Sequence, residues 1–295
     1  MKIAAITITY NDGYKFKEWC EHYEDYKEEL DVHIIVDNNS EPCYLSQVKA
    51  YFTNSIIIER KTNGGCTGAY NSGIKEALKD KDIDAIMLIG NDVKLLPGGI
   101  GILYRFLLSD IRFGSVQPIL LKKDSYVIEN YGCDINKSLY MKFNDYGKSL
   151  YDIEDDFRIV ESVPGGINMS KRSFYEKVGL QDEKLFMYSD EVDMALRAKK
   201  YDFIMGATKK AISWHQHLNP DGGNFRLPFA AYLLGRNKVY LARKHFGFGR
   251  ILFICAVQMK LFIGDILKSR GKKKEVLYQM AFLKGIINGL FYGVI

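Results

Sequence analysis

The chain has 295 residues, a length that fits one large α/β domain with or without a small appendage. Hydrophobic residues make up 47% of it and charged residues 26%, which excludes a largely disordered protein. The formal net charge of +5 is compatible with a nucleotide diphosphate or an anionic lipid surface as partner. It requires neither, and we expect no nucleic-acid partner.

The five cysteines show no CxxC spacing, so we expect reduced thiols in a cytoplasmic protein and neither a zinc site nor a disulfide framework. The apolar run at residues 1–6 is too short for a signal peptide and predicts a strand. The nearest approach to a membrane-spanning helix, residues 251–267, is interrupted by Gln258, Lys260 and Asp265.

The first third of the chain alternates strands with helices. Apolar and β-branched runs predict strands at residues 2–9, 32–36, 55–59 and 85–89, and helical spacing predicts helices at 16–26 and 69–78. This alternation indicates parallel βαβ units in a doubly wound sheet, which binds ligands at the carboxyl ends of its strands. Polar segments follow the four strands, at residues 11–12, 37–40, 63–68 and 91–92. We expect these segments to converge on one edge.

The remainder of the chain predicts a second subsite and a helical tail. Residues 110–165 are irregular and rich in tyrosine, and we expect strands and loops that complete the sheet. Helical patterns follow at 173–179, 191–200 and 229–246. We therefore expect a catalytic domain at 1–245, with a nucleotide-binding half at 1–99 and an acceptor half at 100–245. A helical segment at 246–295 would follow it.

Two strand-end carboxylates suit a nucleotide and its metal. Asp37 can accept a hydrogen bond from the imide N–H of uracil or thymine, although the preference of Asp for turns explains its position equally well. Asp92 is placed to hold Mg²⁺ or Mn²⁺ between itself and a diphosphate. The alternative there is another turn, which Pro97 shortly afterwards supports.

The glycine-rich segment at residues 63–68 suits a phosphate. Its glycines permit close backbone approach, and a helix that starts after Gly68 would offer free N–H groups and a positive dipole end. The segment matches neither a Walker loop nor GxGxxG.

Residues 179–197 form the densest acidic motif. Asp190 as helix N-cap and Asp193 at the capping-box position would explain two of the three carboxylates. Glu191 is then left as a general-base candidate, since charge repulsion and partial burial keep one carboxylate basic. Further on, His215 and His217 stand two residues apart, so they face opposite sides of an extended chain and do not bind one metal together.

The order of these motifs resembles a known family. It runs Tyr-Asn, Asp-Asn-Asn-Ser, Asn-Gly-Gly-x-x-Gly-x-x-Asn-x-Gly, Asn-Asp-Val, Phe-Met-Tyr-Ser-Asp-Glu-Val-Asp, Trp-His and Arg-Asn-Lys-Val-Tyr. Over residues 3–245 the chain resembles the inverting family 2 glycosyltransferases, in particular the bacterial rhamnosyl- and galactofuranosyltransferases of surface polysaccharides. The resemblance implies a GT-A type α/β fold with a Rossmann-like, mostly parallel sheet flanked by helices and a helical C-terminal extension.

The resemblance also implies roles for individual residues. Contacts to a UDP- or dTDP-sugar donor are expected from Thr9, Tyr10, Asp37, Asn39, Asn63, Gly64, Gly68, Asn71, Asn91 and Asp92. A Mn²⁺ or Mg²⁺ ion is expected at Asp92 and His215. Glu191 falls at the position of the catalytic base, with Asp190 as the alternative. Contacts to a glycan or lipid-linked glycan acceptor are expected from Gly165, Gly166, Tyr188, Asp193 and Trp214.

Two departures from the family pattern keep other functions open. Many relatives have acid-x-acid where this chain has Gly90-Asn91-Asp92, and the base is usually an Asp after a Glu, here reversed as Asp190-Glu191. A non-catalytic protein that binds a sugar nucleotide or glycan therefore remains an alternative. A sugar-phosphate nucleotidyltransferase is another, although residues 6–11 lack its basic glycine-rich signature.

The C-terminal tail has two interpretations. The apolar stretch at 251–267 is followed by a basic cluster at 268–274, a pattern typical of a helix on a membrane surface. A helix pair that packs on the catalytic domain or across a homodimer is the alternative. The first interpretation places the protein peripherally on the inner face of the plasma membrane.

Overall fold

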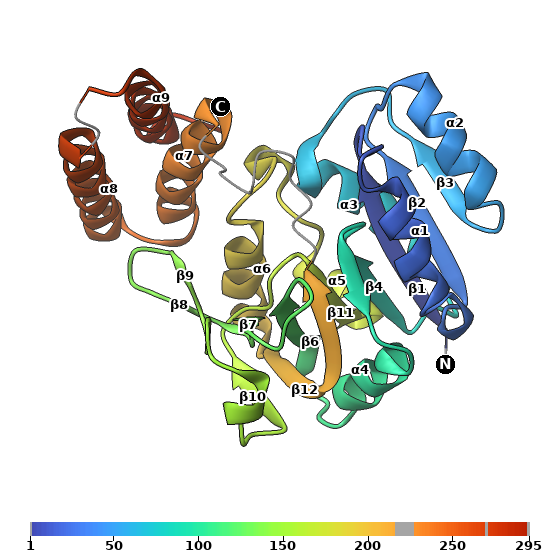
Figure 1. Ribbon diagram of the computed structural model, residues 1–295. Coiled ribbons are helices and arrows are strands. Elements are labelled where there is room, and N and C mark those ends of the chain that lie inside the picture. The colour runs from blue at the N-terminus through green and yellow to red at the C-terminus, as the bar shows by residue number, and fades with distance from the viewer. Residues whose placement is uncertain (1, 216–226, 269–270, 294–295) are drawn as a thin grey trace.

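The computed structural model describes residues 2–215, 227–268 and 271–293, so Gln216 and His217 lie outside the described residues. Its strands are β1 (Ile3–Thr9), β2 (Val32–Asp37), β3 (Ile56–Glu59), β4 (Ala85–Ile89), β5 (Val93–Leu95), β6 (Phe113–Lys122), β7 (Ile128–Asn130), β8 (Cys133–Ile135), β9 (Met141–Phe143), β10 (Phe157–Val160), β11 (Ile167–Lys171) and β12 (Ile204–His215). Its α-helices are α1 (Phe16–Glu24), α2 (Pro42–Tyr51), α3 (Gly65–Ala77), α4 (Gly99–Leu108), α5 (Arg172–Val178), α6 (Asp190–Ala198), α7 (Pro228–His245), α8 (Phe248–Lys268) and α9 (Lys273–Gly289). Figure 1 shows one twisted sheet flanked by helices, with α7, α8 and α9 grouped at one side.

The N-terminal half of the sheet is parallel. Its strands lie in the order β4-β1-β2-β3, and every neighbouring pair among them is parallel. Residues in β1, β2 and β4 are almost all buried and apolar, as expected for parallel strands that are covered on both faces. The four strands and the convergence of their carboxyl ends are thus confirmed. The register places Thr9 opposite Asp37 at that edge.

The other half of the sheet is mixed. β11 runs antiparallel to both β4 and β6, whereas β6 and β12 are parallel to each other. β12 also pairs antiparallel with β5, which brings His215 opposite Val93. A residue from late in the chain thereby reaches the carboxyl end of β4, directly beside Asp92.

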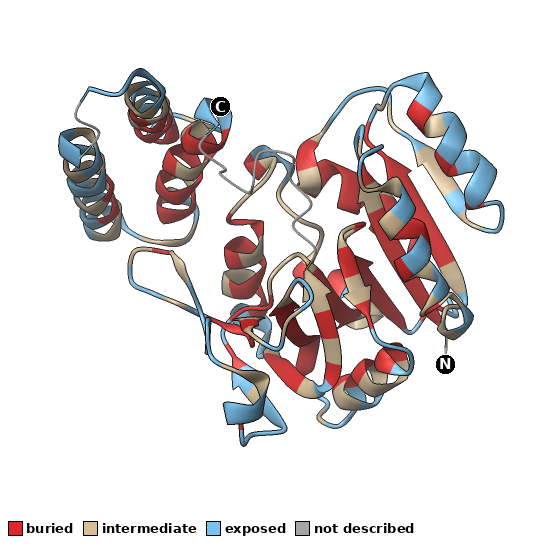
Figure 2. Cartoon of the chain, viewed as in Figure 1, coloured by how far each residue is buried: buried red, intermediate tan, exposed pale blue. Residues whose placement is uncertain are grey.

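Two hydrophobic clusters cover the two faces of this sheet. One includes residues of α3, α5 and α6, such as Ile74, Tyr175 and Met194, and the other includes Ile100 and Leu103 of α4. Figure 2 shows the buried strands between these helices. The α/β fold that the sequence predicts is therefore present, with buried strands fixing the positions of their polar ends.

The C-terminal helices form a packed group around α7. Side chains from α7, α8 and α9 share one cluster with Leu185 and Val192 near the start of α6. α7 and α9 approach closely at glycines, since a Cβ on Gly285 would lie 2.1 Å from Tyr232 O. The expected domain boundary at 245/246 falls in the turn between α7 and α8, but the three helices share a core. Of the helices described, none is long and apolar enough to cross a membrane.

Candidate functional site

The carboxyl ends of β1 and β2 form the first part of the site. Thr9 and Asp37 are adjacent in register, and both are buried. Asp37 Oδ2 accepts a hydrogen bond of 3.1 Å from the Ser40 N–H, while Asp37 Oδ1 is buried without a hydrogen-bond partner among the described residues. Leaving such an oxygen unsatisfied costs free energy. Asp37 Oδ1 is therefore suited to accept a hydrogen bond from an N–H group of a bound nucleobase. Tyr10, the residue after Thr9, is exposed at the surface.

Asn38 organises the glycine-rich loop. Its Nδ2 donates to Asn63 Oδ1 at 2.8 Å and to Gly65 O at 3.1 Å, and its Oδ1 accepts from the Gly64 N–H at 3.0 Å. Asn39, which the sequence analysis selected instead, is exposed and has a φ of 74°. Asparagine tolerates that left-handed conformation, so Asn39 shapes the turn while Asn38 joins the end of β2 to the loop.

The helix after the loop begins earlier than expected, at Gly65. Gly68 N–H donates to Gly64 O at 3.2 Å, so the expectation that N–H groups become free after Gly68 is wrong. Thr67 donates its N–H and its hydroxyl to Phe186 O, at 3.2 and 3.3 Å. Glycines are weak helix formers, which hides this start in the sequence. A carbonyl from a distant loop satisfies one of the N–H groups in the first turn.

Asn71 links helices instead of facing a donor. Its Nδ2 donates to Gln181 O at 2.9 Å and Glu183 Oε1 at 3.0 Å, and its Oδ1 accepts from the Gln181 N–H. The expected contact of Asn71 with ribose and diphosphate is therefore not what the structure shows. Arg60, which the sequence analysis missed, lies over the glycine loop and donates from Nη1 to Gly68 O at 2.6 Å.

Asp92 has a basic partner on each carboxylate oxygen. Lys15 Nζ lies 2.9 Å from Oδ2, and His215 Nε2 lies 3.5 Å from Oδ1. His215 Nδ1 is 2.8 Å from Glu129 Oε1 on β7. Burial alone would raise the pKa of Asp92, but His215 and Lys15 hold it well below its usual range. Burial would lower the pKa of His215, but Asp92 and Glu129 outweigh that effect and raise it to about 9.

Asn91 fastens β4 to the loop after β1. Its Nδ2 donates to Asp12 Oδ2 at 2.8 Å and to Thr9 Oγ1 at 3.4 Å, and the side chain is buried. Asp12 Oδ2 also accepts from the Tyr10 N–H at 3.2 Å. Asp12, which was not selected from the sequence, thus brings a second carboxylate to the edge, with Oδ1 3.9 Å from Lys15 Nζ.

The acidic pair Asp190 and Glu191 lies at the start of α6. Glu191 Oε1 accepts a hydrogen bond of 3.2 Å from the Gly165 N–H, and Glu191 Oε2 is buried without a partner among the described residues. Burial and the neighbouring charge of Glu191 raise the pKa of Asp190 well above its usual range. These two carboxyl groups are adjacent in a buried site and do not readily ionise together, and Glu191, with its unpartnered Oε2, is the candidate proton acceptor.

The expected capping roles in this motif are wrong. Ser189, with a φ of 67°, is the N-cap of α6, and its side chain makes no capping hydrogen bond. Asp193 is fully buried, and its carboxylate pairs at 2.7 to 2.8 Å with Arg197, Lys244 and His245. These partners occupy both oxygens, so Asp193 joins α6 to α7 and is not offered to an acceptor.

The loop before α6 is held in shape by α7. Three of its residues have left-handed backbone conformations, which cost free energy outside glycine: Phe186, Tyr188 and Ser189. Asn237 Nδ2 donates at 2.8 to 3.1 Å to three carbonyl oxygens of the loop, those of Leu185, Met187 and Tyr188. Arg236 Nη2 donates to Leu185 O as well and to one further carbonyl oxygen, that of Lys184. The Arg-Asn pair on α7 therefore fixes the segment that carries the acidic pair.

The other expected acceptor residues surround this segment. Gly166 O accepts from the Gly90 N–H at 2.8 Å, which ties β11 to the end of β4. Trp214 is half-buried, and its Nε1 donates to Ser125 O at 2.8 Å. Contacts of an acceptor with Gly165, Gly166, Tyr188 and Trp214 remain predictions.

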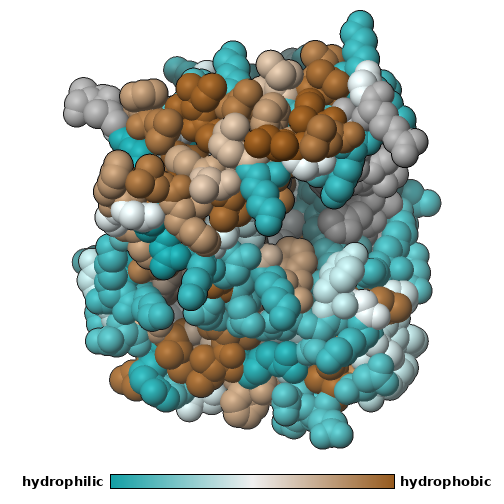
Figure 3. Space-filling view, turned by 90° about the vertical axis from the view of Figure 1, so that its left-hand side faces the viewer, coloured by the Kyte–Doolittle hydropathy of each residue, from teal (hydrophilic) through white to brown (hydrophobic). Residues whose placement is uncertain are grey.

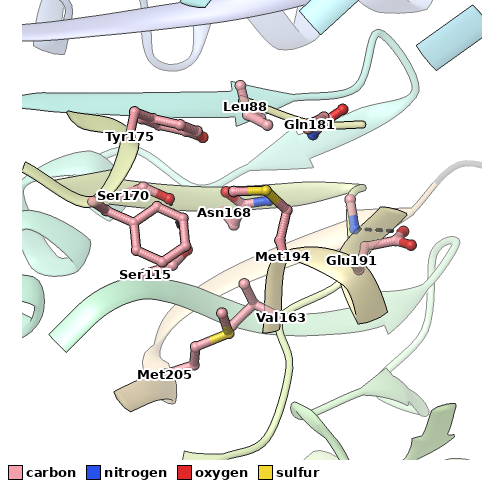
Figure 4. Close-up of a pocket in the computed structure, with 12 residues that line it drawn as sticks. Leu88, Ser115, Val163, Asn168, Ser170, Tyr175, Gln181, Glu191, Met194 and Met205 are labelled. Atoms are coloured by element: carbon pink, nitrogen blue, oxygen red, sulfur yellow. Dashed lines mark hydrogen bonds between the residues drawn. The ribbon is translucent and has the colours of Figure 1, made fainter. Parts of the chain in front are cut away.

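A small cavity lies behind Glu191. Figure 4 shows Glu191 at one end of it, with Asn168 and Ser170 of β11 and Met194 of α6 along its walls. Its volume of about 30 Å³ holds one or two water molecules and no sugar ring. A sugar substrate must therefore reach Glu191 from outside this cavity.

The fold is shared with solved glycosyltransferase structures of the GT-A type. One is GalNAc-T7 with UDP, GalNAc and Mn²⁺, with a TM-score of 0.60 and 12% identity, covering 82% of this chain and 50% of that one. A second is the mannosyltransferase PcManGT from Pyrobaculum calidifontis with GDP-Man and Mn²⁺, with a TM-score of 0.60 and 12% identity, covering 99% and 88%. A third is S. aureus TarS, residues 1–349, with a TM-score of 0.56 and 13% identity, covering 98% and 81%.

The sequence comparison identifies the family. Residues 5–154 match the model of Glycosyl transferase family 2, and the chain belongs to this family. A curated relative is the low-salt glycan biosynthesis hexosyltransferase Agl10 of Haloferax volcanii, 23% identical over 212 residues. That match covers 70% of this chain and 65% of Agl10.

Proposed function

We propose that the chain is an inverting glycosyltransferase that moves a hexosyl group from a nucleoside-diphosphate sugar to a hydroxyl of a glycan or lipid-linked glycan. The donor would carry UDP or dTDP, and the sugar would be rhamnose, galactose, galactofuranose or a similar hexose. The observation that carries the proposal is the buried, unpartnered Oδ1 of Asp37 at the same sheet edge as the Asp92–His215 pair. We expect the nucleobase at Asp37 and the diphosphate at Asp92.

We call the carboxyl ends of β1, β2 and β4, with Asp37 and Asp92, the donor edge. The donor edge fits a divalent cation if the donor supplies some of the ligands. Asp92 supplies a carboxylate, and His215 supplies an imidazole whose other nitrogen is held by Glu129, as is common for metal-binding histidines. No ready-made cage of three His, Cys, Asp or Glu side chains occurs in the described ranges. The remaining ligands would be phosphate oxygens and water. Bound there, Mn²⁺ or Mg²⁺ would stabilise the charge that develops on the leaving diphosphate.

The chemistry at the acidic pair is a single in-line displacement. Glu191 takes the proton of the acceptor hydroxyl through its unpartnered Oε2 while the acceptor oxygen forms a bond to the anomeric carbon. The bond between that carbon and the diphosphate oxygen breaks, its electron pair leaves with the nucleoside diphosphate, and the configuration inverts. Gly165 N–H, on Oε1, orients the base.

A donor screen tests this function. UDP-, dTDP- and GDP-sugars would be compared for thermal stabilisation in Mn²⁺, because a ligand at 100 times its Kd adds about 2.7 kcal/mol to the stability of the folded state. The stabilising donor is then incubated with glycan acceptors, and the anomeric configuration of the product is determined by NMR. Stabilisation without transfer or hydrolysis of any donor would favour a binding protein, and retention of configuration would exclude the single displacement.

We also propose that α8 and α9 dock on an anionic lipid surface at the inner face of the plasma membrane. Figure 3 shows apolar side chains gathered over these helices. The exposed apolar residues are Phe248, Leu252, Phe253, Leu261, Ile263, Leu267, Leu277, Met280 and Ile287. Exposed lysines lie among them, at Lys260, Lys268, Lys272, Lys273, Lys274 and Lys284. Apolar anchors with positive charges around them suit acidic headgroups.

Point substitutions test the lipid contact better than deletion of the tail, since α7 would lose its packing partners. Phe253→Glu combined with Leu267→Glu should abolish co-sedimentation with vesicles that contain phosphatidylglycerol, and Ile111→Glu, at a site that is 88% exposed on another part of the molecule, should not. Unchanged sedimentation of the double variant would contradict the proposal. A dimer that the double variant dissociates, without any vesicle binding, would favour the homodimer instead.

A further inference from the structure

Lys15 places a fixed positive charge at the donor edge. It precedes α1, and its N–H donates to Asp12 O at 2.8 Å, which closes the turn after β1. Its side chain is only 14% exposed. The ammonium lies 2.9 Å from Asp92 Oδ2 and 3.9 Å from Asp12 Oδ1. The charge is thus held by two carboxylates at the point where the carboxyl ends of β1 and β4 meet.

This position coincides with the departure from the family pattern. Glycine occupies the place of the first acid of the acid-x-acid motif, at Gly90, and Asn91 donates to Asp12 inside the loop network. Asp92 is therefore the carboxylate that remains from that motif. His215 approaches one of its oxygens and Lys15 the other. A divalent-cation site with one carboxylate depends on the phosphates of the donor for its further ligands, and the Lys15 ammonium already offsets the charge of that carboxylate.

We propose that Lys15 binds the diphosphate of the nucleotide directly and allows the chain to bind nucleoside diphosphates without a divalent cation. This inference rests on the proposed function, because it requires a nucleotide at the edge formed by Asp37 and Asp92. In this proposal the nucleobase lies at Asp37, at the end of β2, and the phosphates lie at the ends of the neighbouring strands β1 and β4. Lysine binds phosphate as a point charge on a flexible stem, so its ammonium can turn from Asp92 to a phosphate oxygen.

The same geometry has a consequence for metal binding. A divalent cation held by Asp92 and His215 would share the single negative charge of Asp92 with the Lys15 ammonium, so the two positive groups compete for that carboxylate. Both face the same phosphates, so either can supply the positive charge for nucleotide binding. If Lys15 only fastened α1 to β4, its removal would lower the stability of the fold without a specific effect on phosphate binding.

Calorimetric titration with UDP, dTDP and GDP in EDTA and in Mn²⁺ distinguishes these roles. Wild type, Lys15→Met and Lys15→Arg are compared with Lys17→Met, a control on the same helix whose lysine is 90% exposed. The wild type should bind one of these nucleotides in EDTA. Lys15→Met should weaken that binding about tenfold or more and change binding in Mn²⁺ much less. Lys15→Arg should retain most of it, Lys17→Met all of it, and uridine or guanosine, without phosphate, should bind all four proteins equally.

A direct measurement of Mn²⁺ affinity by electron paramagnetic resonance, without nucleotide, completes the test. Removal of the competing ammonium should tighten Mn²⁺ binding in Lys15→Met, and this gain shows that the variant is folded. Equal nucleotide affinity of wild type and Lys15→Met in EDTA would overturn the inference, as would binding by the wild type only in Mn²⁺. Absence of UDP, dTDP and GDP binding under every condition would contradict the proposed function itself.

Discussion

Buried carboxyl groups at the donor edge and in the acidic pair have pKa values shifted in opposite directions. At the donor edge, basic groups on both oxygens keep the pKa of Asp92 far below its usual range. At the start of α6, burial and the adjacent Glu191 raise the pKa of Asp190. The pKa of the same residue type is thus lowered in one region and raised in the other. Neighbours decide whether a carboxylate serves as a cation partner or as part of a proton-accepting pair.

The two regions are also built differently. The donor edge is assembled from the ends of β1, β2 and β4, and their register alone brings Thr9 and Asp37 together. The acidic pair depends on Asn237 of α7, which holds three carbonyl groups of the preceding loop. A change in α7 should therefore disturb catalysis and spare the donor. A change at the end of a strand should weaken donor binding and leave catalysis at saturating donor unchanged.

The largest expected effect comes from Glu191→Gln, which removes the base and keeps its shape. Transfer should fall by about 10²- to 10⁴-fold, the usual contribution of general-base catalysis, while the Kd for the donor changes little. Rates of glycosyl transfer and calorimetric donor titration measure the two quantities.

Asp190→Asn is the matched control for the base. Because burial and the neighbouring Glu191 raise the pKa of Asp190 and so favour its neutral form, the neutral amide is a close substitute, and most activity should remain. A loss at Asp190→Asn as large as that at Glu191→Gln would show that the pair acts as a unit. Loss at Asp190 alone would assign the base there.

The second effect should come from Asn237→Ala on α7. It leaves three loop carbonyls without their donor, and the strained loop loses its support. We expect about 3 kcal/mol of destabilisation, measured by urea unfolding, with a fall in kcat and an almost unchanged donor Kd. Asn288→Ala on α9, which removes one hydrogen bond to the Tyr232 hydroxyl, should cost much less. Equal loss of donor affinity and kcat in Asn237→Ala would contradict the separation of the two regions.

The sequence predicts the donor edge better than the acidic pair, for a physical reason. The end of a strand can be recognised from the residues next to it in the sequence, and Asp37 and Asp92 are polar residues that follow apolar runs. The start of α3 at Gly65 is not local, because Phe186 O supplies an acceptor there across 119 residues. The cap of α6 at Ser189 likewise depends on α7. The residues next to Lys15 and Glu129 in the sequence do not mark either one as part of a site. Only the folded sheet brings Lys15 to Asp92 and Glu129 to His215.

The third effect is the contribution of Asp193, in the region of the acidic pair, to the stability of the fold at low pH. Burial alone would raise the pKa of Asp193, but the hydrogen bond from His245 and the charges of Arg197 and Lys244 outweigh it and lower it to about 2. Because the folded-state pKa lies below the unfolded one, this stabilisation is complete above about pH 4 and is lost as the pH falls toward 2. It amounts to roughly 2 kcal/mol.

Urea unfolding from pH 6 down to pH 2 tests that contribution. Asp193→Asn should be less stable at pH 6, and the gap to the wild type should close toward pH 2. A gap that stays constant with pH would mean that packing, and not ionisation, makes Asp193 important. Donor binding at pH 6 should be the same in both proteins, since Asp193 lies on the side of the acidic pair.

The last effect, of about the same size as that at Asp193, should come from Asp37→Asn, at the donor edge. The amide oxygen can still accept from the Ser40 N–H, but the amide NH₂ then faces the ligand N–H in place of Oδ1. A lost hydrogen bond to a charged group costs about 1.5–3 kcal/mol, so affinity for UDP or dTDP should fall at least about tenfold. Saturating donor should restore kcat, because the α7–α6 contacts are untouched. A kcat that stays low at saturating donor would show that the two regions are coupled after all, through the Phe186 carbonyl that reaches Thr67.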